Sequence, residues 1–161
     1  MRFILVALLL AGCASPSPVS VVTSSPVAAT PRPPTPAAID DAGLLAACEI
    51  PPLLVDLGPL IENATAALAG EYSEWAVAAE PLNEKIATVV AATNPVPNRP
   101  PFAAWKAAVL EMLLHLSEAV IAYDTGMAEG TVSDILLGNE YLSQATDSLA
   151  NVTEGAAFFS C

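Results

Sequence analysis

The sequence is short of basic residues. Its 161 residues include five Lys and Arg against 17 Asp and Glu, which gives a formal net charge of −12 at pH 7. Proteins that bind nucleic acid need a basic surface to neutralise phosphates. The same deficit disfavours docking along an anionic membrane surface. The composition therefore predicts that nucleic acid is not a partner.

Aromatic residues and catalytic motifs are also scarce. Aromatics make up 6% of the chain, whereas 54% of it is hydrophobic, with Ala, Leu and Val prominent. Ala and Leu lose little side-chain freedom in a helix, so this mixture favours helices over sheets. There is one histidine, and the chain has no Gly-x-Ser-x-Gly, no phosphate-binding glycine loop and no Cys-x-x-Cys pair. We expect a protein that is not an enzyme and that uses no cofactor.

The first residues have the layout of an export signal. A basic residue, Arg2, precedes an apolar run from Phe3 to Leu10. The run is followed by two small residues and a cysteine, in the order Leu10-Ala11-Gly12-Cys13. The residues before the cysteine are too few to cross a hydrocarbon core, which needs roughly 20 helical residues.

This stretch resembles the lipobox of bacterial lipoproteins. The resemblance covers only these residues and implies that residues 1–12 are a signal peptide removed before Cys13. It also implies that the Cys13 thiol carries a diacylglyceryl group, often with palmitate or a similar acyl group on the new amino terminus. The protein would then be extracytoplasmic and lipid-anchored to the cell membrane or outer membrane. An ordinary secretory signal, cleaved after Ala14, is the alternative.

A spacer follows the cysteine. Residues 13–38 are rich in Pro, Ser and Thr, and proline prevents helices and central strands because it lacks the amide donor. The stretch 14–38 would reach at most about 80 Å as a polyproline helix, at about 3.1 Å per residue. The same composition leaves O-glycosylation open.

Residues 39–161 carry the apolar periodicity of an all-α domain. Gly70, the proline-rich stretch 94–101 and the pair Gly126 and Gly130 interrupt it. We predict an antiparallel up-down bundle of four helical segments, at about 42–69, 73–93, 101–126 and 131–159. The apolar spacing continues across Gly70, so three long helices after a short N-terminal helix are the alternative.

The third and fourth segments have distinct patterns. In the third segment, apolar residues including Leu110, Leu114 and Ile121 cover well over half of the circumference, so we expect the most buried helix there. In the last segment, large residues such as Leu142 alternate with small ones such as Gly138 along one face. Such a face lets two antiparallel helices approach closely.

The three cysteines bear on the topology. A lipidated Cys13 leaves Cys48 and Cys161, which predicts a disulfide in an oxidising compartment; two free thiols are the alternative. One long helix over residues 59–93 would separate these cysteines by a bundle about 40 Å tall. Reversal of the chain near Gly70 brings them to one end, which is why we prefer four helices.

The single histidine has two acidic neighbours on its helical face. Glu111 precedes His115 by four residues and Glu118 follows it by three, a spacing that makes the three residues weak candidates for metal ligands. Di-iron bundles need a Glu-x-x-His motif on each of two helices, and zinc needs further ligands. We interpret the three residues as a solvated polar stripe and predict no metal site.

Two hypotheses for function remain. The first is a non-enzymatic, membrane-anchored module that binds another envelope protein or acts structurally, as the tether and the lack of catalytic motifs indicate. The second is a carrier or sensor of a small ligand or cation held within the bundle. The apolar interior and the acidic composition motivate the second hypothesis.

The lipobox resemblance generates the first prediction. A Cys13→Ser variant should lose palmitate labelling and move from the membrane fraction to the soluble secreted fraction, because a hydroxyl cannot form the thioether. Labelling and fractionation of wild type and variant from the same host check this. Membrane fractionation that the substitution leaves unchanged would show that Cys13 is not the anchor.

Overall fold

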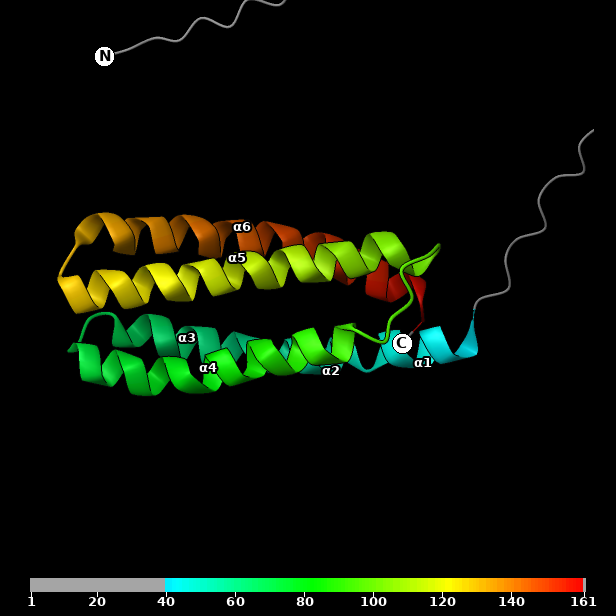
Figure 1. Cartoon of the computed structure of the whole chain (residues 1–161), viewed down its shortest axis with the longest axis horizontal. Coiled ribbons are helices and arrows are strands. Elements are labelled where there is room, and N and C mark those ends of the chain that lie inside the picture. The colour runs from blue at the N-terminus through cyan, green and yellow to red at the C-terminus, as the bar shows by residue number, and fades with distance from the viewer. Residues whose placement is uncertain (1–39, 161) are drawn as a thin grey trace, which may run out of the picture. The chain divides into compact units, whose positions relative to one another are not determined.

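The computed structural model describes residues 40–160, which form a bundle of antiparallel helical arms with no strand in this range (Figure 1). The predicted signal peptide, Cys13, the tether and Cys161 lie outside the described residues. The helices are α1 (Asp41–Cys48), α2 (Ile50–Val55), α3 (Leu57–Ala67), α4 (Tyr72–Thr93), α5 (Phe102–Glu129) and α6 (Val132–Phe158).

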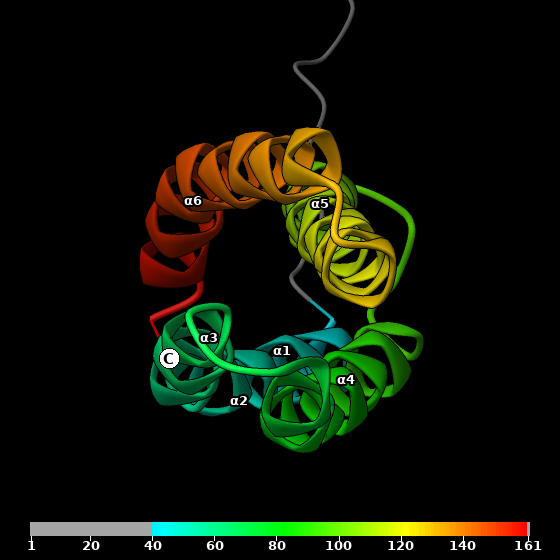
Figure 2. The same ribbon diagram turned by 90° about the vertical axis from the view of Figure 1, so that its left-hand side faces the viewer.

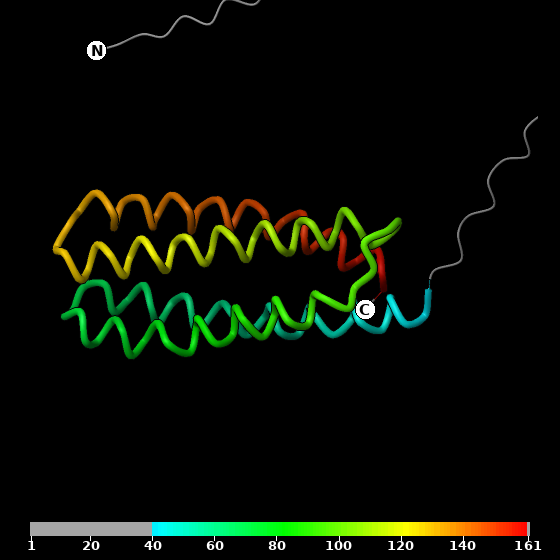
Figure 3. Tube along the Cα trace, in the orientation of Figure 1, coloured from blue at the N-terminus to red at the C-terminus, as the bar shows by residue number. Residues whose placement is uncertain are grey.

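The first arm consists of α1, α2 and α3, which follow one another in one direction (Figure 3). The residues between them, Glu49 and Asp56, keep right-handed helical backbone angles, so the chain does not turn back. Prolines stand in the first turns of α2 and α3, where they remove amide donors that a continuous helix would use. The predicted segment 42–69 is therefore three short helices in line.

The chain reverses at residues 68–71, as the four-helix prediction requires. The Ala69 and Gly70 amides donate to Ala66 and Ala67 at 3.4 and 3.0 Å, and Glu71 has extended backbone ahead of α4. α4 then returns beside α3. The predicted antiparallel up-down bundle is confirmed, and the alternative with one long helix across Gly70 is wrong.

α5 and α6 form the most extensive helix pair, as the figures show from the side and from the end (Figures 1 and 2). The buried residues of α6 are Gly138, Ala145 and Val152, at intervals of seven residues. A Cβ on Gly138 would stand 2.5 Å from the Tyr123 ring of α5, so only glycine permits this approach. The Trp105 indole donates to the Val152 carbonyl at 2.8 Å across the same seam. The predicted close pairing through small residues is confirmed.

α5 is the most buried helix, as expected, but its buried face covers less of the helix circumference than its apolar residues do. Its long neighbours are α4 and α6, which leave the outward side of the helix uncovered. Three side chains that the periodicity assigned to the widened buried face are exposed: Leu110 (37%), Leu114 (57%) and Ile121 (65%). That part of the prediction is wrong, because two neighbours cannot cover an arc that wide.

An aromatic cluster closes the end of the bundle where α1 begins and α6 ends. The Phe102 ring stacks on Phe159 at 5.1 Å between centroids, and Trp105 meets Phe159 edge-on at 5.2 Å. Phe102 also lies against Gly43 of α1, where an added Cβ would be 2.9 Å from its ring. α1 and the end of α6 thus share one end of the bundle, the arrangement that the predicted disulfide requires.

Two helical glycines in contrasting surroundings generate a matched prediction. Gly138→Ala should destabilise the domain by about 1–3 kcal/mol, because the methyl group overlaps the Tyr123 ring. Gly58→Ala should change stability by less than about 1 kcal/mol, because a Cβ there meets nothing within 4 Å apart from its chain neighbours, and the strain of a side chain before Pro59 offsets the restriction of the unfolded chain. Urea denaturation followed by circular dichroism measures both. Equal effects of the two substitutions would contradict the described packing.

The predicted Cys48–Cys161 disulfide also has a direct test. Neither thiol should react with an alkylating reagent until the protein is reduced, and reduction should lower stability by about 2–5 kcal/mol because it releases a long loop. Mass spectrometry after alkylation, with and without reductant, gives the result. Alkylation of both cysteines without reductant would rule the disulfide out.

Candidate functional site

The predicted polar stripe on α5 is only partly assembled in the structure. His115 Nδ1 lies 3.3 Å from a Glu118 carboxylate oxygen, and the His115 ring stacks on Tyr141 of α6 at 6.5 Å between centroids. Glu111 is exposed. Between residues 40 and 160, no group of three or more His, Cys, Asp or Glu side chains is arranged to hold a metal ion. The stripe offers a surface contact between α5 and α6.

The basic side chains of the domain are all engaged. Lys85 pairs with Asp56 at 2.5 Å and Arg99 with Asp40 at 2.8 Å. The hydrogen bond from Arg99 holds the pKa of the Asp40 carboxyl below its ordinary value. Lys106 donates to the backbone carbonyls of the loop after α4, at 2.7 and 3.0 Å. Residues 40–160 contain these three cations and all 17 acidic residues, a net charge of −14, so the surface favours neutral or cationic molecules.

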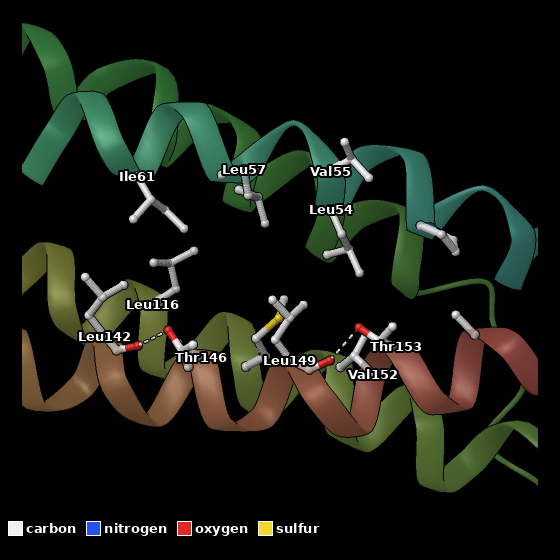
Figure 4. A pocket seen from close by; sticks show the side chains of 15 residues that line it. Leu54, Val55, Leu57, Ile61, Leu116, Leu142, Thr146, Leu149, Val152 and Thr153 are labelled. Atoms are coloured by element: carbon white, nitrogen blue, oxygen red, sulfur yellow. Dashed lines mark hydrogen bonds between the residues drawn. The ribbon is translucent and has the colours of Figure 1, made fainter.

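The most distinctive feature of the bundle is an apolar groove between its first and last arms. α2 and α3 form one wall, α6 forms the other, and α5 forms the floor (Figure 4). The cavity has a volume of about 430 Å³. Its lining residues are Pro51, Leu54, Val55, Leu57, Gly58, Ile61, Met112, Leu116, Leu142, Ala145, Thr146, Leu149, Val152, Thr153 and Ala156.

Each wall of the groove is one helical face. On the first arm, residues 51, 54, 58 and 61 recur at steps of three and four, and on α6 so do residues 142, 145, 149, 152 and 156. The arms run in opposite directions, so Ile61 lies across from Leu142 and Leu54 lies across from Val152 (Figure 4). The groove therefore follows the bundle axis.

Small residues leave the space open. Gly58 stands between Leu54 and Ile61 on the wall-facing stripe, and a Cβ there would meet no atom within 4 Å. Ala145 and Ala156 occupy two of the positions on the facing wall. Larger residues at these positions would fill the gap between the arms, so the groove depends on their size.

The lining is almost devoid of available polar groups. The two hydroxyls, from Thr146 and Thr153, donate to carbonyls of their own helix at 2.9 and 2.8 Å (Figure 4). The protons of these hydroxyls are therefore used within α6, which leaves only their oxygen lone pairs as acceptors. None of the lining side chains is charged. The groove can hold an apolar molecule by hydrophobic burial and dispersion, and it offers no acid, base or nucleophile.

Part of the apolar surface of the first arm faces the groove. The run Asp41–Ala67 is long and apolar enough to cross a membrane by length and composition, with a mean hydropathy of 1.7 in its most apolar window. The core helix of a soluble protein or a signal sequence passes the same test, which makes this weak evidence. Only 17% of that window is buried in the bundle, and Leu54, Gly58 and Ile61 face the groove.

A second cavity near the end of α6 is a weaker candidate. It is lined by Trp105 and Phe158 together with Asn151 and Glu154, and it is more open to solvent. It has the same volume, about 430 Å³, but because it is more open and partly polar it covers an apolar molecule less completely than the groove does.

Sequence reasoning did not find the groove. It identified the alternating face of the last segment correctly and assigned that face to helix pairing alone. The sequence does place small residues on two apolar faces that a four-arm bundle brings opposite each other. It contains no pattern that reports the distance between those faces.

Comparison of the chain with protein-family models, curated proteins and solved structures finds no match in any of the three.

Proposed function

We propose that this chain is a lipid-anchored extracytoplasmic protein whose helical domain binds an apolar small molecule in the groove between α2–α3 and α6. The anchoring rests on the resemblance of Leu10–Cys13 to a lipobox. The binding function rests on one observation, the cavity of about 430 Å³ with apolar walls.

The size and chemistry of the groove support binding of a small molecule. Ligand sites are concave, mostly apolar and typically about 300–1,000 Å³ in volume. The groove falls within this range, and its walls include partly exposed residues such as Leu149, which is 42% exposed. Covering such surface stabilises a complex by about 25 cal/mol per Å² of apolar area removed from water.

The lining also selects among ligands. A cation would lose hydration in a groove whose lining has no charged side chain and whose only side-chain oxygens are two threonine hydroxyls. Of the two kinds of ligand considered from the sequence, the geometry therefore favours an apolar molecule over a cation. Since the groove has no reactive group, we propose a carrier or sensor and not an enzyme.

A second candidate function has an observation of its own. Leu110, Leu114 and Ile121 form an exposed apolar stripe on the outer side of α5. Such a stripe would suit contact with another envelope protein, as the first hypothesis from the sequence proposes. The groove remains the better-supported site because it is concave and more extensively apolar.

Binding of the fluorescent apolar probe N-phenyl-1-naphthylamine tests the groove. The full chain with Cys13→Ser should enhance probe fluorescence in saturable fashion, without the detergent that a lipid anchor would require. Adding Gly58→Phe should weaken binding at least tenfold, because the ring fills the open space beside Gly58. Gly58→Ala should leave binding nearly unchanged, and circular dichroism verifies that each variant folds.

Leu114→Ser provides the control for binding elsewhere. Leu114 lies outside the groove and is exposed, so this substitution should not alter probe affinity. If Leu114→Ser abolished binding while Gly58→Phe did not, the α5 stripe would be the binding surface and the groove proposal would be wrong.

A further inference from the structure

We infer that the groove takes a single extended alkyl chain of a membrane lipid with an uncharged headgroup, such as a monoacylglycerol. This inference rests on the proposed binding function and names the class of ligand. Four observations support it: the length of the groove, its width, the net charge of the domain and the closeness of the predicted anchor to membrane lipid.

The groove has the length of an acyl chain. Its α6 wall extends from Leu142 to Ala156, which at 1.5 Å per residue is about 21 Å. An acyl chain in a bilayer covers half of a hydrocarbon core of about 30 Å, or about 15 Å. A chain of ordinary membrane length therefore fits along the groove.

The groove has the width of one chain. A volume of about 430 Å³ spread over about 21 Å gives a mean cross-section of about 20 Å². Non-bonded carbon atoms approach to about 4 Å, so a groove this narrow takes one alkyl chain more readily than two side by side. A helix is about 10–12 Å wide with its side chains, so a helical peptide or a helix of a second copy cannot lie inside the groove and can only rest over its mouth.

The charge of the domain disfavours an anionic headgroup, and the groove lining has no carboxylate to pair with a cationic one. Residues 40–160 carry a net charge of −14, and Lys85, Arg99 and Lys106 are already engaged by protein oxygens. An anionic carboxylate or phosphate at the rim would meet repulsion with no uncommitted cation to offset it. A glycerol headgroup carries no charge and can remain in water above the groove.

The predicted anchor indicates the source of the lipid. With Cys13 lipidated as proposed, the tether predicted at residues 13–38, with a reach of at most about 80 Å, would keep the groove near the membrane surface. The protein's own anchor is a poorer occupant than a free lipid, because it carries two or three acyl chains and placing one in the groove leaves the others outside it. A single-chain lipid from the bilayer has only one chain to place in the groove and lies close to the anchored domain.

A chain-length series tests this inference. Monoacylglycerols from octanoyl to octadecanoyl, below their micelle concentrations, should displace the naphthylamine probe from the full Cys13→Ser chain. Affinity should rise about fourfold per methylene, the factor that corresponds to about 0.8 kcal/mol, and level off once the chain fills the groove. Oleate should bind more weakly than 1-oleoylglycerol, which carries the same chain without the charge.

The outcomes separate the inference from the proposed function. If the probe binds in a Gly58-dependent manner but no alkyl chain displaces it, the groove binds apolar molecules and the lipid inference is wrong. If oleate binds more tightly than 1-oleoylglycerol, the inference that the ligand has an uncharged headgroup is wrong. If octanoylglycerol binds as tightly as octadecanoylglycerol, the extended-chain geometry is wrong.

Wild-type protein in phosphatidylcholine vesicles distinguishes the source. A photoreactive monoacylglycerol should label α3 and α6 in both the wild type and the Cys13→Ser variant, and Gly58→Phe should remove the label. Labelling that occurs only when Cys13 is replaced would show that the protein's own anchor occupies the groove. That result would overturn the assignment to a membrane lipid.

Discussion

The close approach of α6 to α5 is the constraint on which the rest of the domain depends. Gly138 lies against the Tyr123 ring where no Cβ would fit, and the Trp105 indole bonds to the Val152 carbonyl in the same seam. α6 is thereby held against α5, with Gly138 at the closest contact. The opposite arm, α1–α3, packs mainly on α4. Because α6 packs on α5 and the first arm packs on α4, α6 and α3 are not in close contact. The space between them is the groove.

The groove has apolar walls that are partly exposed, an arrangement that offers no stability by itself. An apolar molecule in the groove would remove that surface from water and so raise the free energy of unfolding of the domain. The threonine hydroxyls on α6 are bound to their own helix, and the acidic residues do not line the groove. The domain thus keeps charge on its outside and an apolar channel between two arms.

Much of the fold was predictable from the sequence. The segment expected at 101–126 is α5, Phe102–Glu129, and the segment expected at 131–159 is α6, Val132–Phe158. The reversal near Gly70 followed from combining a glycine break with a proposed cysteine pair. Two features were not predictable in this way. Val96, in the proline-rich loop, is buried although loop composition indicates exposure, and the outer residues of α5 are exposed although their periodicity indicates burial. Both depend on which neighbours are present, and residue spacing within one segment contains no such information.

The sequence by itself determined which segments are helical, where the chain turns, how acidic the domain is and which residues resemble a lipobox, since each of these follows from local composition and spacing. Only the tertiary structure decided that the two apolar faces containing Gly58 and Leu149 stand opposite each other with open space between them. Periodicity sets the direction in which a helical face points, whereas the distance between two faces depends on side-chain volumes contributed by all the arms at once.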